Sequence, residues 1–486
     1  MVHYQMVFQT WWEAKLPSLT TKAANNRKSR TQPIIGSPLF PFPVQKYGSL
    51  VLLQFGAIPV LIVSSADAAR EIMRTHDLNF AYRHAFRVQA KLLYNYKDLA
   101  LSPYGEFWRQ LKSIFVLKLL SNKMVQSFHS IREEETSILV KRITDHIPSG
   151  PVNLRNMLPE FTNYVVCRSA CGGNYTQSEN GKKFWDLLKE MSELMGAVGI
   201  PDFYPWLSWI TRVNGLDKRV DSFVKRMDDF LEGMIGERLE TRKDEQDVGE
   251  GNRDNFLDIL IDMYKAGNTS GVSMDKDGIK AMLLNVFLAG VDSTATVMEW
   301  VMTELLRHPT VMEKLQNEIR QIVKDKQDVK DHDIQKMHYL KAVMKETLRY
   351  HPPIPIILRR QGTNDVKIKG YDVKAGTLVM INNWAIGRDP RFWDEPETFQ
   401  PERFFNSSID FKGLDFELIP FGGGRRGCPG TAFSIATIEF VLANLLHKFN
   451  WELPDGAQGR DLDMTENLMG TLHREIPLTV VATQIK

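Results

Sequence analysis

The stretch PFGGGRRGCPG, residues 420–430, decides how this 486-residue sequence is interpreted, because it fits two different kinds of site. Its glycines at positions 422, 424 and 427 have the spacing of a dinucleotide-binding loop. That loop needs a βαβ unit around it, and only 56 residues follow Gly430. The same glycines can instead bring the backbone close to a flat ligand while Cys428 is presented to a metal. We favour the second interpretation, because it also gives Cys428 a role.

The neighbours of Cys428 favour a thiolate and an anionic partner. An apolar helical pattern begins near Pro429 or Gly430 and continues as TAFSIATIEFVLANLLHKF. The amino end of a helix offers free N–H groups and a partial positive charge, and both stabilise a thiolate. Arg425 and Arg426 supply cations for carboxylates. A thiolate, a flat anionic ligand and an arginine together describe a haem with its propionates.

Composition narrows the remaining possibilities. The 61 basic residues nearly balance the 59 acidic ones, for a net charge of +2, so the composition gives no argument for a nucleic-acid partner. Three cysteines are too few for a disulfide framework and indicate a reducing compartment. Cys167 and Cys171 lie in an apolar run and are expected to pack as small hydrophobes. No uninterrupted apolar window of about 18–20 residues exists, so no membrane-spanning helix is predicted.

The periodicity of the chain predicts mostly helix with small sheets. Residues 49–65 read as two short strands around a turn at 56–59, and residues 365–382 read as short hairpins. Most windows between 105 and 245 have helical spacing. An apolar pattern over 274–308 is expected to be a long helix that crosses the core. Further helices are predicted near 309–325, 331–336 and 337–350.

The cysteine motif resembles the haem-binding signature of the cytochrome P450 family. FGGGRRGCPG, residues 421–430, fits the family pattern of Phe, two residues, Gly, one residue, Arg, one residue, Cys, one residue and Gly. The resemblance implies that Cys428 is the proximal ligand to the iron of haem b. It also implies that Phe421 packs beside the sulfur and that Arg425 pairs with a propionate. The implied fold is mainly α with small β-sheets, with the haem between a long central helix and the helix after the cysteine loop.

Two further motifs extend the resemblance to the charged core. KETLR places Glu346 and Arg349 three residues apart on one helical face, and PERF supplies Arg403. Taken alone, the first pair fits an exposed ion pair of little energetic weight. The resemblance implies instead that the three residues form a buried, charge-paired structural set on the haem side of the core.

Other positions match residues that hold the haem propionates in the family. FWRQLK supplies Trp108 and Lys112, although an amphipathic helix with a core tryptophan explains them equally well. Arg360, in PIILRRQ, matches another propionate-binding arginine. Arg359 stands where plant relatives usually have proline, and Gln361 stands where they usually have glutamate.

The stretch LAGVDSTAT, residues 288–296, carries the expected chemistry on the opposite side of the haem. An acid and an alcohol inside a buried helix are costly unless they have partners. A hydroxyl beside a carboxylate can hold a relay water for protons. The resemblance assigns Gly290 to a groove for dioxygen and Asp292, Ser293 and Thr294 to proton delivery. The alternative is that the two hydroxyls only bond back to their own helix.

Together, these matches predict a haem-thiolate monooxygenase of the plant microsomal type, similar to furanocoumarin- and terpenoid-oxidising members. The expected substrate is a small lipophilic plant metabolite, and the expected electron source is NADPH through a flavoprotein reductase that docks on the Cys428 side. A haem-thiolate isomerase or dehydratase that uses no O₂, and a degenerate relative that only binds haem, are the alternatives. Substrate contacts are expected at apolar positions: Phe287, Ala289, Ile356, Ile357, Leu468 and Met469.

The resemblance begins at about Pro33 and continues to the end of the chain. We therefore expect a single catalytic domain over 33–486, preceded by an atypical segment, 1–32, without a clear membrane anchor. Attachment to the cytosolic face of the endoplasmic reticulum membrane is implied by the resemblance alone.

Overall fold

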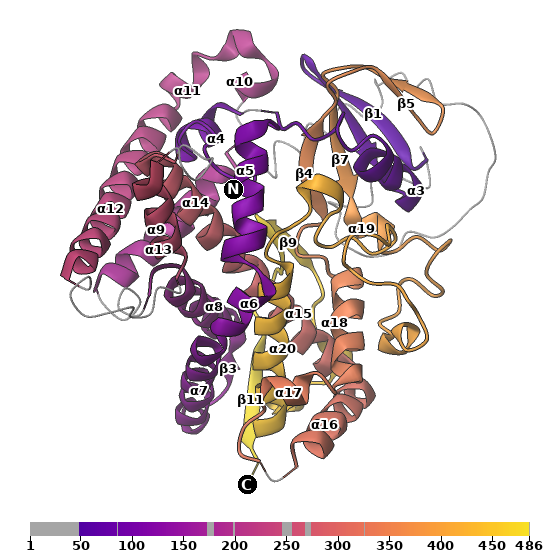
Figure 1. The fold of residues 1–486 in the computed structure, drawn as a ribbon. Coiled ribbons are helices and arrows are strands. Elements are labelled where there is room, and N and C mark those ends of the chain that lie inside the picture. The colour runs from indigo at the N-terminus through magenta and orange to yellow at the C-terminus, as the bar shows by residue number, and fades with distance from the viewer. Residues whose placement is uncertain are drawn as a thin grey trace.

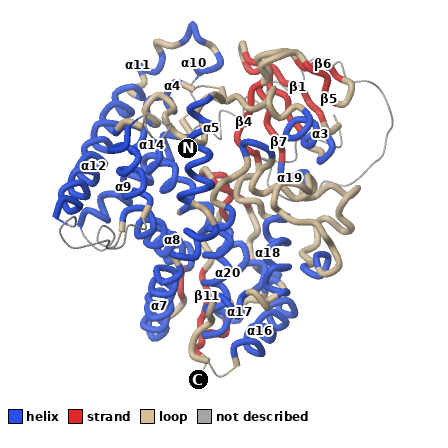
Figure 2. Tube along the Cα trace, viewed as in Figure 1, coloured by secondary structure: helices blue, strands red, loops and turns tan. Residues whose placement is uncertain are grey.

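The computed structural model describes residues 48–84, 86–172, 179–197, 200–244, 255–267, 274–324 and 326–485. The atypical segment predicted for residues 1–32 lies outside them. Helices fill most of the molecule, and the largest sheet lies at one upper corner beside α3 (Ala66–Arg70) (Figures 1 and 2). The predicted class, mainly α with small β-sheets, is confirmed.

The corner sheet joins two distant parts of the chain. Its order is β1-β2-β7-β4, and β2 pairs with β7 in parallel, with Val60 opposite Leu378. The predicted turn between the first two strands is tighter than expected, because Pro59 already belongs to β2. The four strands are β1 (Leu50–Phe55), β2 (Ile58–Val63), β4 (Ile356–Gln361) and β7 (Leu378–Asn382).

Three smaller sheets complete the β-structure. The 365–382 region contains one predicted hairpin, β5 with β6, and then enters the corner sheet. The strands of the smaller sheets are β3 (Val152–Asn153), β5 (Val366–Ile368), β6 (Tyr371–Val373), β8 (Phe449–Glu452), β9 (Glu466–Met469), β10 (Thr471–Arg474) and β11 (Thr479–Gln484).

Two consecutive helices, α14 (Lys276–Gly290) and α15 (Asp292–Arg307), run through the core where one long helix was predicted. The two are separated only at Val291, so the prediction is correct in outline and wrong about continuity. Trp300 and Leu305 of α15 have no exposed surface. Helix α15 packs against α8, α18 and α20, which places it at the centre of the helical layers (Figure 1).

The remaining helices surround this core. The three helices predicted after residue 308 are present as α16, α17 and α18, and the helix after Cys428 begins at Thr431. The helices other than those already given are α4 (Arg87–Leu92), α5 (Glu106–Ile114), α6 (Asn122–Ser127), α7 (His129–His146), α8 (Leu154–Cys171), α9 (Glu179–Met195), α10 (Ile200–Phe203), α11 (Ile210–Val213), α12 (Leu216–Asp244), α13 (Phe256–Ala266), α16 (Pro309–Val323), α17 (Asp331–Ile334), α18 (His338–Tyr350), α19 (Asn383–Ile386) and α20 (Thr431–Lys448).

Candidate functional site

The loop before Cys428 is held in a shape that requires glycine. The Cys428 N–H donates to the Phe421 carbonyl at 2.9 Å, which closes the loop. Gly422 and Gly424 have φ of 71° and 65°, a region that favours glycine. A Cβ on Gly424 would lie 2.1 Å from the carbonyl oxygen of Met73. The glycines therefore let this loop lie directly against the segment that follows α3.

Cys428 itself lies at the wall of a cleft. Its side chain has accessible surface, and it contributes to the lining of a cavity of about 860 Å³. Burial by the surrounding protein raises the pKa of the Cys428 thiol, whereas the Gly430 N–H, the Lys112 charge and Thr431 act in the opposite direction. Lys112 is close because its Nζ donates to the Gly427 carbonyl at 2.5 Å. Coordination to a metal would remove the thiol proton outright.

Arg360 is well placed to donate hydrogen bonds to an anion. It is 1% exposed, and its Nη2 donates to the Gly423 carbonyl at 2.8 Å. Its Nε and Nη1 are buried and have no hydrogen-bond partner, although Nη1 lies 3.6 Å from Asp77. Burial lowers the pKa of Arg360 to about 10. Because buried donors are almost always paired, these two N–H groups indicate a missing acceptor.

The arginine of the cysteine motif is Arg426, and the expectation placed on Arg425 needs correction. The family spacing leaves one residue between arginine and Cys428, which selects Arg426. The side chain of Arg425 is 49% exposed and pairs with Asp77 at 3.1 Å. Arg426 instead points inward, donates to the carbonyl of Ser102 at 2.6 Å and lies 4.3 Å from the Trp108 ring centre. The motif spacing was the signal that could have identified it.

The Trp108 side chain is hydrogen-bonded to the backbone in this structure. Its Nε1–H donates to the carbonyl of Leu99 at 2.9 Å, and the side chain is 4% exposed. The core-tryptophan alternative therefore describes its contacts. Lys112, one turn later on α5, remains directed at the cysteine loop.

The two hydroxyls after Asp292 have partners that do not form a relay. Ser293 Oγ donates to the Ala289 carbonyl at 2.6 Å, so this hydroxyl bonds back across the break at Val291. Thr294 is buried, and its Oγ1 lies 3.2 Å from Ser434 Oγ on α20. Thr294 thus faces the helix that follows Cys428. Ala289, in contrast to Thr294, is exposed.

Asp292 has partners that sequence reasoning missed. Thr471 Oγ1 donates to Asp292 Oδ2 at 2.6 Å, and His473 Nε2 lies 3.2 Å from Oδ1. Burial acts to raise the pKa of Asp292, but the hydrogen bond and charge of His473 and the hydrogen bond from Thr471 outweigh it, so the pKa is lowered. The side chain of Asp292 stays 38% exposed. No sequence motif predicts this contact, because 179 residues separate Asp292 from Thr471.

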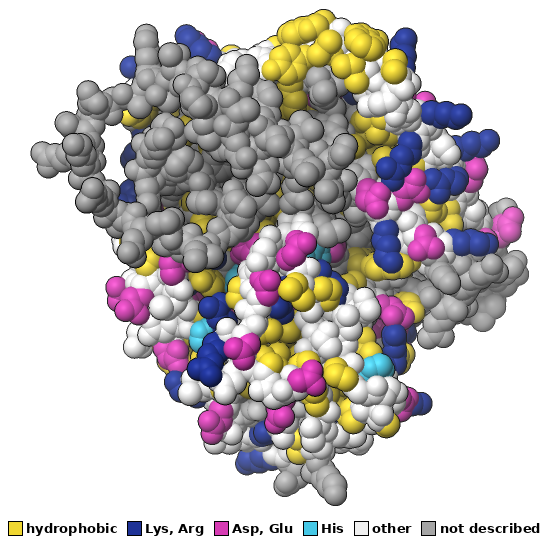
Figure 3. All heavy atoms as spheres, turned by 180° about the vertical axis from the view of Figure 1, so that it is seen from behind, with side chains coloured by type: hydrophobic (Ala, Val, Ile, Leu, Met, Phe, Trp, Pro, Cys, Tyr) yellow, Lys and Arg dark blue, Asp and Glu magenta, His cyan; other side chains and the backbone are white. Residues whose placement is uncertain are grey.

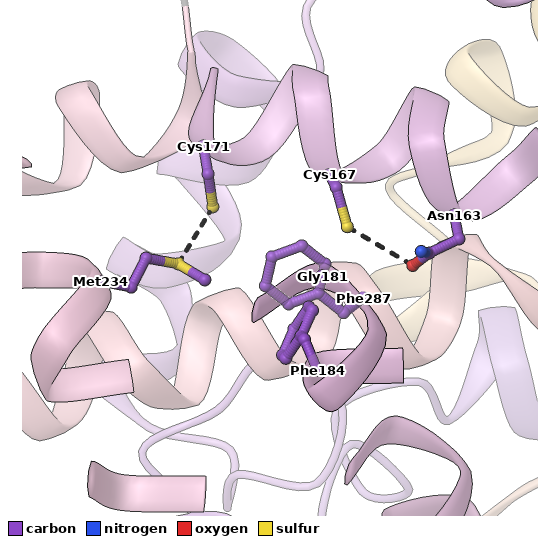
Figure 4. Close-up of a pocket in the computed structure, with 7 residues that line it drawn as sticks. All are labelled: Asn163, Cys167, Cys171, Gly181, Phe184, Met234 and Phe287. Carbon is purple, nitrogen blue, oxygen red and sulfur yellow. Dashed lines mark hydrogen bonds between the residues drawn. The ribbon is translucent and has the colours of Figure 1, made fainter. Parts of the chain in front are cut away.

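Gly290 and Phe287 lie on the side of α14 that packs against other helices. A Cβ on Gly290 would lie 3.1 Å from Val166 of α8, so glycine permits this close helix contact. Phe287 is 1% exposed and packs on Phe184, with ring centres 4.7 Å apart. Figure 4 shows both rings beside the two cysteines of α8, where they line a cavity of about 10 Å³. Phe287 is therefore a core residue here, apart from Ala289.

The predicted substrate residues outside α14 are brought to two strands. Ile356 and Ile357 are half-buried in β4, and Leu358 after them is 44% exposed. Leu468 is half-buried in β9, one strand away from the partners of Asp292. The side chain of Met469 lies outside the described residues.

The structure brings the three residues of the charged set together. Arg349 donates to Glu346 from both Nε and Nη2 at 2.7 Å, and Arg403 Nε donates to Glu346 at 3.0 Å. The side chains of Glu346 and Arg349 have no exposed surface. Arg349 also donates to the carbonyl of Gly387, whose own Cβ would lie 2.3 Å from the Arg349 carbonyl. This set fastens α18 to the segment that leads toward the cysteine loop.

These residues fit a haem with a thiolate ligand. The fit rests on an accessible thiol, a loop that needs glycine, and two buried Arg360 N–H groups without acceptors. Within the described ranges, no group of three or more His, Cys, Asp or Glu side chains could hold a metal ion. A porphyrin, which supplies four ligands of its own, removes the need for such a group.

Comparisons with known proteins match the family that the cysteine motif resembles. A family model described as Cytochrome P450 matches residues 44–480. The chain is 59% identical over 383 residues to Cytochrome P450 71A8 of Mentha piperita, covering 79% of this chain and 74% of that protein. It is 42% identical over 485 residues to the tabersonine/lochnericine 19-hydroxylase of Catharanthus roseus, covering 97% and 95%. A zebra fish cytochrome P450 solved with progesterone has a TM-score of 0.77 at 24% identity, covering 91% and 98%.

Proposed function

We propose that the substrate of this protein is a small lipophilic plant metabolite of terpenoid, coumarin or phenylpropanoid type. The chain belongs to the cytochrome P450 family and is therefore a monooxygenase. The observation that carries the function is the accessible Cys428 thiol just before α20. Helix α20 packs against α15, where Ser434 contacts Thr294. Ala289 and Leu358 are exposed and Leu468 is half-buried, and these apolar side chains support a lipophilic substrate.

The haem, when bound, supplies the activation of O₂, from which one oxygen atom enters the substrate and the other leaves as water. Cys428 Sγ provides the thiolate ligand. Arg360 Nε and Nη1 are the donors for a propionate, and Lys112 adds positive charge on the cysteine side. Phe421, whose carbonyl fixes the Cys428 N–H, closes the loop around the sulfur.

Asp292 is the acid of the proposed proton delivery. Thr471 engages Oδ2, while the exposed part of the carboxylate can accept a proton from water and pass it on. Ser293 can assist only after its hydroxyl leaves the Ala289 carbonyl. The buried position of Thr294 supports a packing role against α20 in place of the catalytic role expected for it.

A flavoprotein reductase that draws on NADPH is the proposed electron donor, and the cleft beside Cys428 is its proposed docking surface. Lys341 and Lys345 of α18 and Lys412 line this cleft, against the carboxyls of Asp410 and Glu439. Burial raises the pKa of Glu439 to about 7, so this carboxyl carries only part of a negative charge near neutral pH. The resulting positive balance favours an acidic partner.

Attachment to the endoplasmic reticulum membrane is supported by an apolar surface around α11. Trp206, Trp209 and Val213 are 65%, 57% and 77% exposed, and Leu52 of β1 is 63% exposed. Figure 3 shows hydrophobic side chains gathered at this upper edge of the molecule. Within the described residues, one helical stretch, Lys276–Arg307, is long and apolar enough to span a membrane, and 61% of its 18-residue apolar window is buried inside the protein.

The decisive test is turnover of the purified haem-loaded protein. With a plant reductase, NADPH and O₂, a panel of terpenoids, coumarins and phenylpropanoids should give at least one product that carries one oxygen from labelled O₂. Product formation without NADPH would favour the isomerase or dehydratase alternative, against which the Asp292–Ser293 pair argues. Absence of the thiolate-type band in the carbon-monoxide difference spectrum would favour the degenerate haem-binding relative.

The docking proposal has its own test. Lys412→Glu places a negative charge at the cleft, where the lysine side chain is 74% exposed. We expect a raised KM for the reductase with little change in kcat. The control is Lys374→Glu, which alters a lysine that is 76% exposed on the β5–β6 side and should leave both constants unchanged. Equal behaviour of the two variants would contradict the proposed surface.

A further inference from the structure

A small polar cluster joins α15 to the hairpin formed by β9 and β10. Thr471 and His473 of β10 both contact the Asp292 carboxylate. Thr296, one turn after Asp292 on α15, lies 3.2 Å from His473 Nδ1 and 3.0 Å from Thr471 Oγ1. His473 Nε2 also lies 2.9 Å from Thr471 Oγ1. Every polar side-chain atom of the two threonines and the histidine therefore has a partner.

The cluster is buried on one side and open on the other. Thr296, Thr471 and His473 are 1%, 6% and 7% exposed, whereas the Asp292 side chain keeps 38% of its surface. Burying hydroxyls and an imidazole is costly unless they are hydrogen-bonded, so this set favours one arrangement of its members. The arrangement fixes one edge of the carboxylate and leaves the rest accessible.

The imidazole can keep its place in either charge state. When His473 is neutral with hydrogen on Nε2, Thr296 Oγ1 donates to Nδ1. When His473 is protonated, Nδ1–H donates to Thr296 Oγ1, which can then donate to Thr471 Oγ1. Thr471 donates to Asp292 Oδ2 in both cases. Only the Thr296 hydroxyl therefore reverses its role toward His473. Arg155 of α8 is a further cation whose charge acts on Asp292.

We propose that Thr471 and His473 are positioning residues for Asp292, which they hold at the break between α14 and α15. This role rests on the proposed monooxygenase function, because it concerns the acid that delivers protons there. The same hairpin carries Leu468, which lies opposite Leu472. Trp300 Nε1 donates to the Leu472 carbonyl at 2.6 Å and ties the strand to α15. The carboxylate is therefore coupled to a strand pair that also carries a proposed substrate contact.

Two variants each remove one of the side chains that contact the Asp292 carboxylate, and neither changes a residue near Cys428. In Thr471→Val and His473→Phe, we expect product formed per NADPH to fall about tenfold, with hydrogen peroxide made instead, since loss of a group that orients a reacting residue typically has effects of about 10-fold or more. His473→Gln retains a donor and should recover most of the ratio. Thr162→Val removes a buried hydroxyl that bonds only within α8, and it should match the wild type. The carbon-monoxide band should be unchanged in all four.

A second measurement does not depend on turnover. The denaturation midpoints of the holoenzyme, of Asp292→Asn, of His473→Phe and of the double variant form a cycle. We expect the double variant to lose clearly less than the sum of the two single losses. Additive losses, or a peroxide yield in Thr471→Val and His473→Phe equal to that of Thr162→Val, would overturn the proposal. A wild type that shows no NADPH-dependent oxidation would sink the proposed function instead, and the cycle would still decide whether His473 holds Asp292.

Discussion

The two sides of the site are built by different means. On the cysteine side, the motif that presents Cys428 lies between Phe421 and Thr431, and Lys112 and Arg360 add hydrogen bonds to its backbone from elsewhere in the chain. On the α15 side, the carboxylate of Asp292 is held by Thr471, which is 179 residues away. A motif that lies within one short segment can be recognised by a pattern. A site built from two packed elements depends on the register between a helix and a strand.

The largest effect should come from the cysteine side. Cys428→Ala removes the only proposed iron ligand from the protein, so we expect loss of the thiolate-type band and of all oxidation. The carbon-monoxide difference spectrum and product assays would measure both. Cys167→Ala is the matched control, because Cys167 is buried in α8 with Asn163 as its neighbour and should leave the band intact. Persistence of the band in Cys428→Ala would refute the assignment of this ligand.

The next effect should come from the charged set behind the cysteine loop. Glu346→Gln leaves the guanidinium of buried Arg349 without its carboxylate, and breaking such a pair costs about 3–5 kcal/mol. Denaturant unfolding and haem retention would report the loss. Glu402→Gln breaks a more exposed pair with Lys314 and should cost less than about 1 kcal/mol. Similar losses in the two variants would show that the set near Arg349 carries no special weight.

The pH dependence of unfolding in acid tests a buried carboxyl on the α15 side. Burial acts to raise the pKa of Glu304, but hydrogen bonds from His308 and His351 lower it to about 2. Because this carboxyl is more acidic in the folded protein, its stabilisation is present above about pH 4.5 and is lost as the pH falls toward 2. In Glu304→Gln, up to about 3 kcal/mol of this acid dependence should disappear from unfolding measurements. Glu313→Gln, at an exposed position on α16, should keep the wild-type slope.

The smallest effect separates backbone strain from crowding in the cysteine loop. In Gly424→Ala, the alanine would have to adopt a φ of 65°, and its Cβ would lie 2.1 Å from the Met73 carbonyl oxygen. We therefore expect the free energy of unfolding to fall by at least about 2 kcal/mol. Gly456→Ala has a similar φ of 70° with open space around it, and about 1 kcal/mol is expected. Differences in unfolding free energy would measure the two. Equal losses would mean that the loop tolerates a closer approach than its contacts indicate.

Patterns within a segment were sufficient for features that depend on nearby residues. The glycine–cysteine motif, the Glu346–Arg349 spacing and the apolar run over 274–308 all depend on neighbours within a few turns, so periodicity and motif reveal them. The error over Arg425 arose within that same motif, since its spacing already pointed to Arg426. The approximate extents of the helices followed from apolar patterns. The break at Val291 was not predicted, although Gly290 precedes it and the polar run Asp292–Thr294 follows it.

Such patterns could not predict contacts between elements that are distant in the sequence. The direction of a side chain on a buried helix depends on which helix faces it, and a sequence with apolar residues on all sides does not specify this. For this reason Phe287 was expected beside substrate, although it packs on Phe184, and Thr294 was expected in a relay, although it faces Ser434.

The sequence by itself determined the family, the mainly helical class and the cysteine proposed to bind iron, because these depend on residues that lie close together in the chain. Only the tertiary structure decided which acceptors remain missing around Arg360 and which groups hold Asp292. The physical reason is that burial and hydrogen-bond pairing are properties of packed surfaces. Two segments acquire them only when the fold places one against the other.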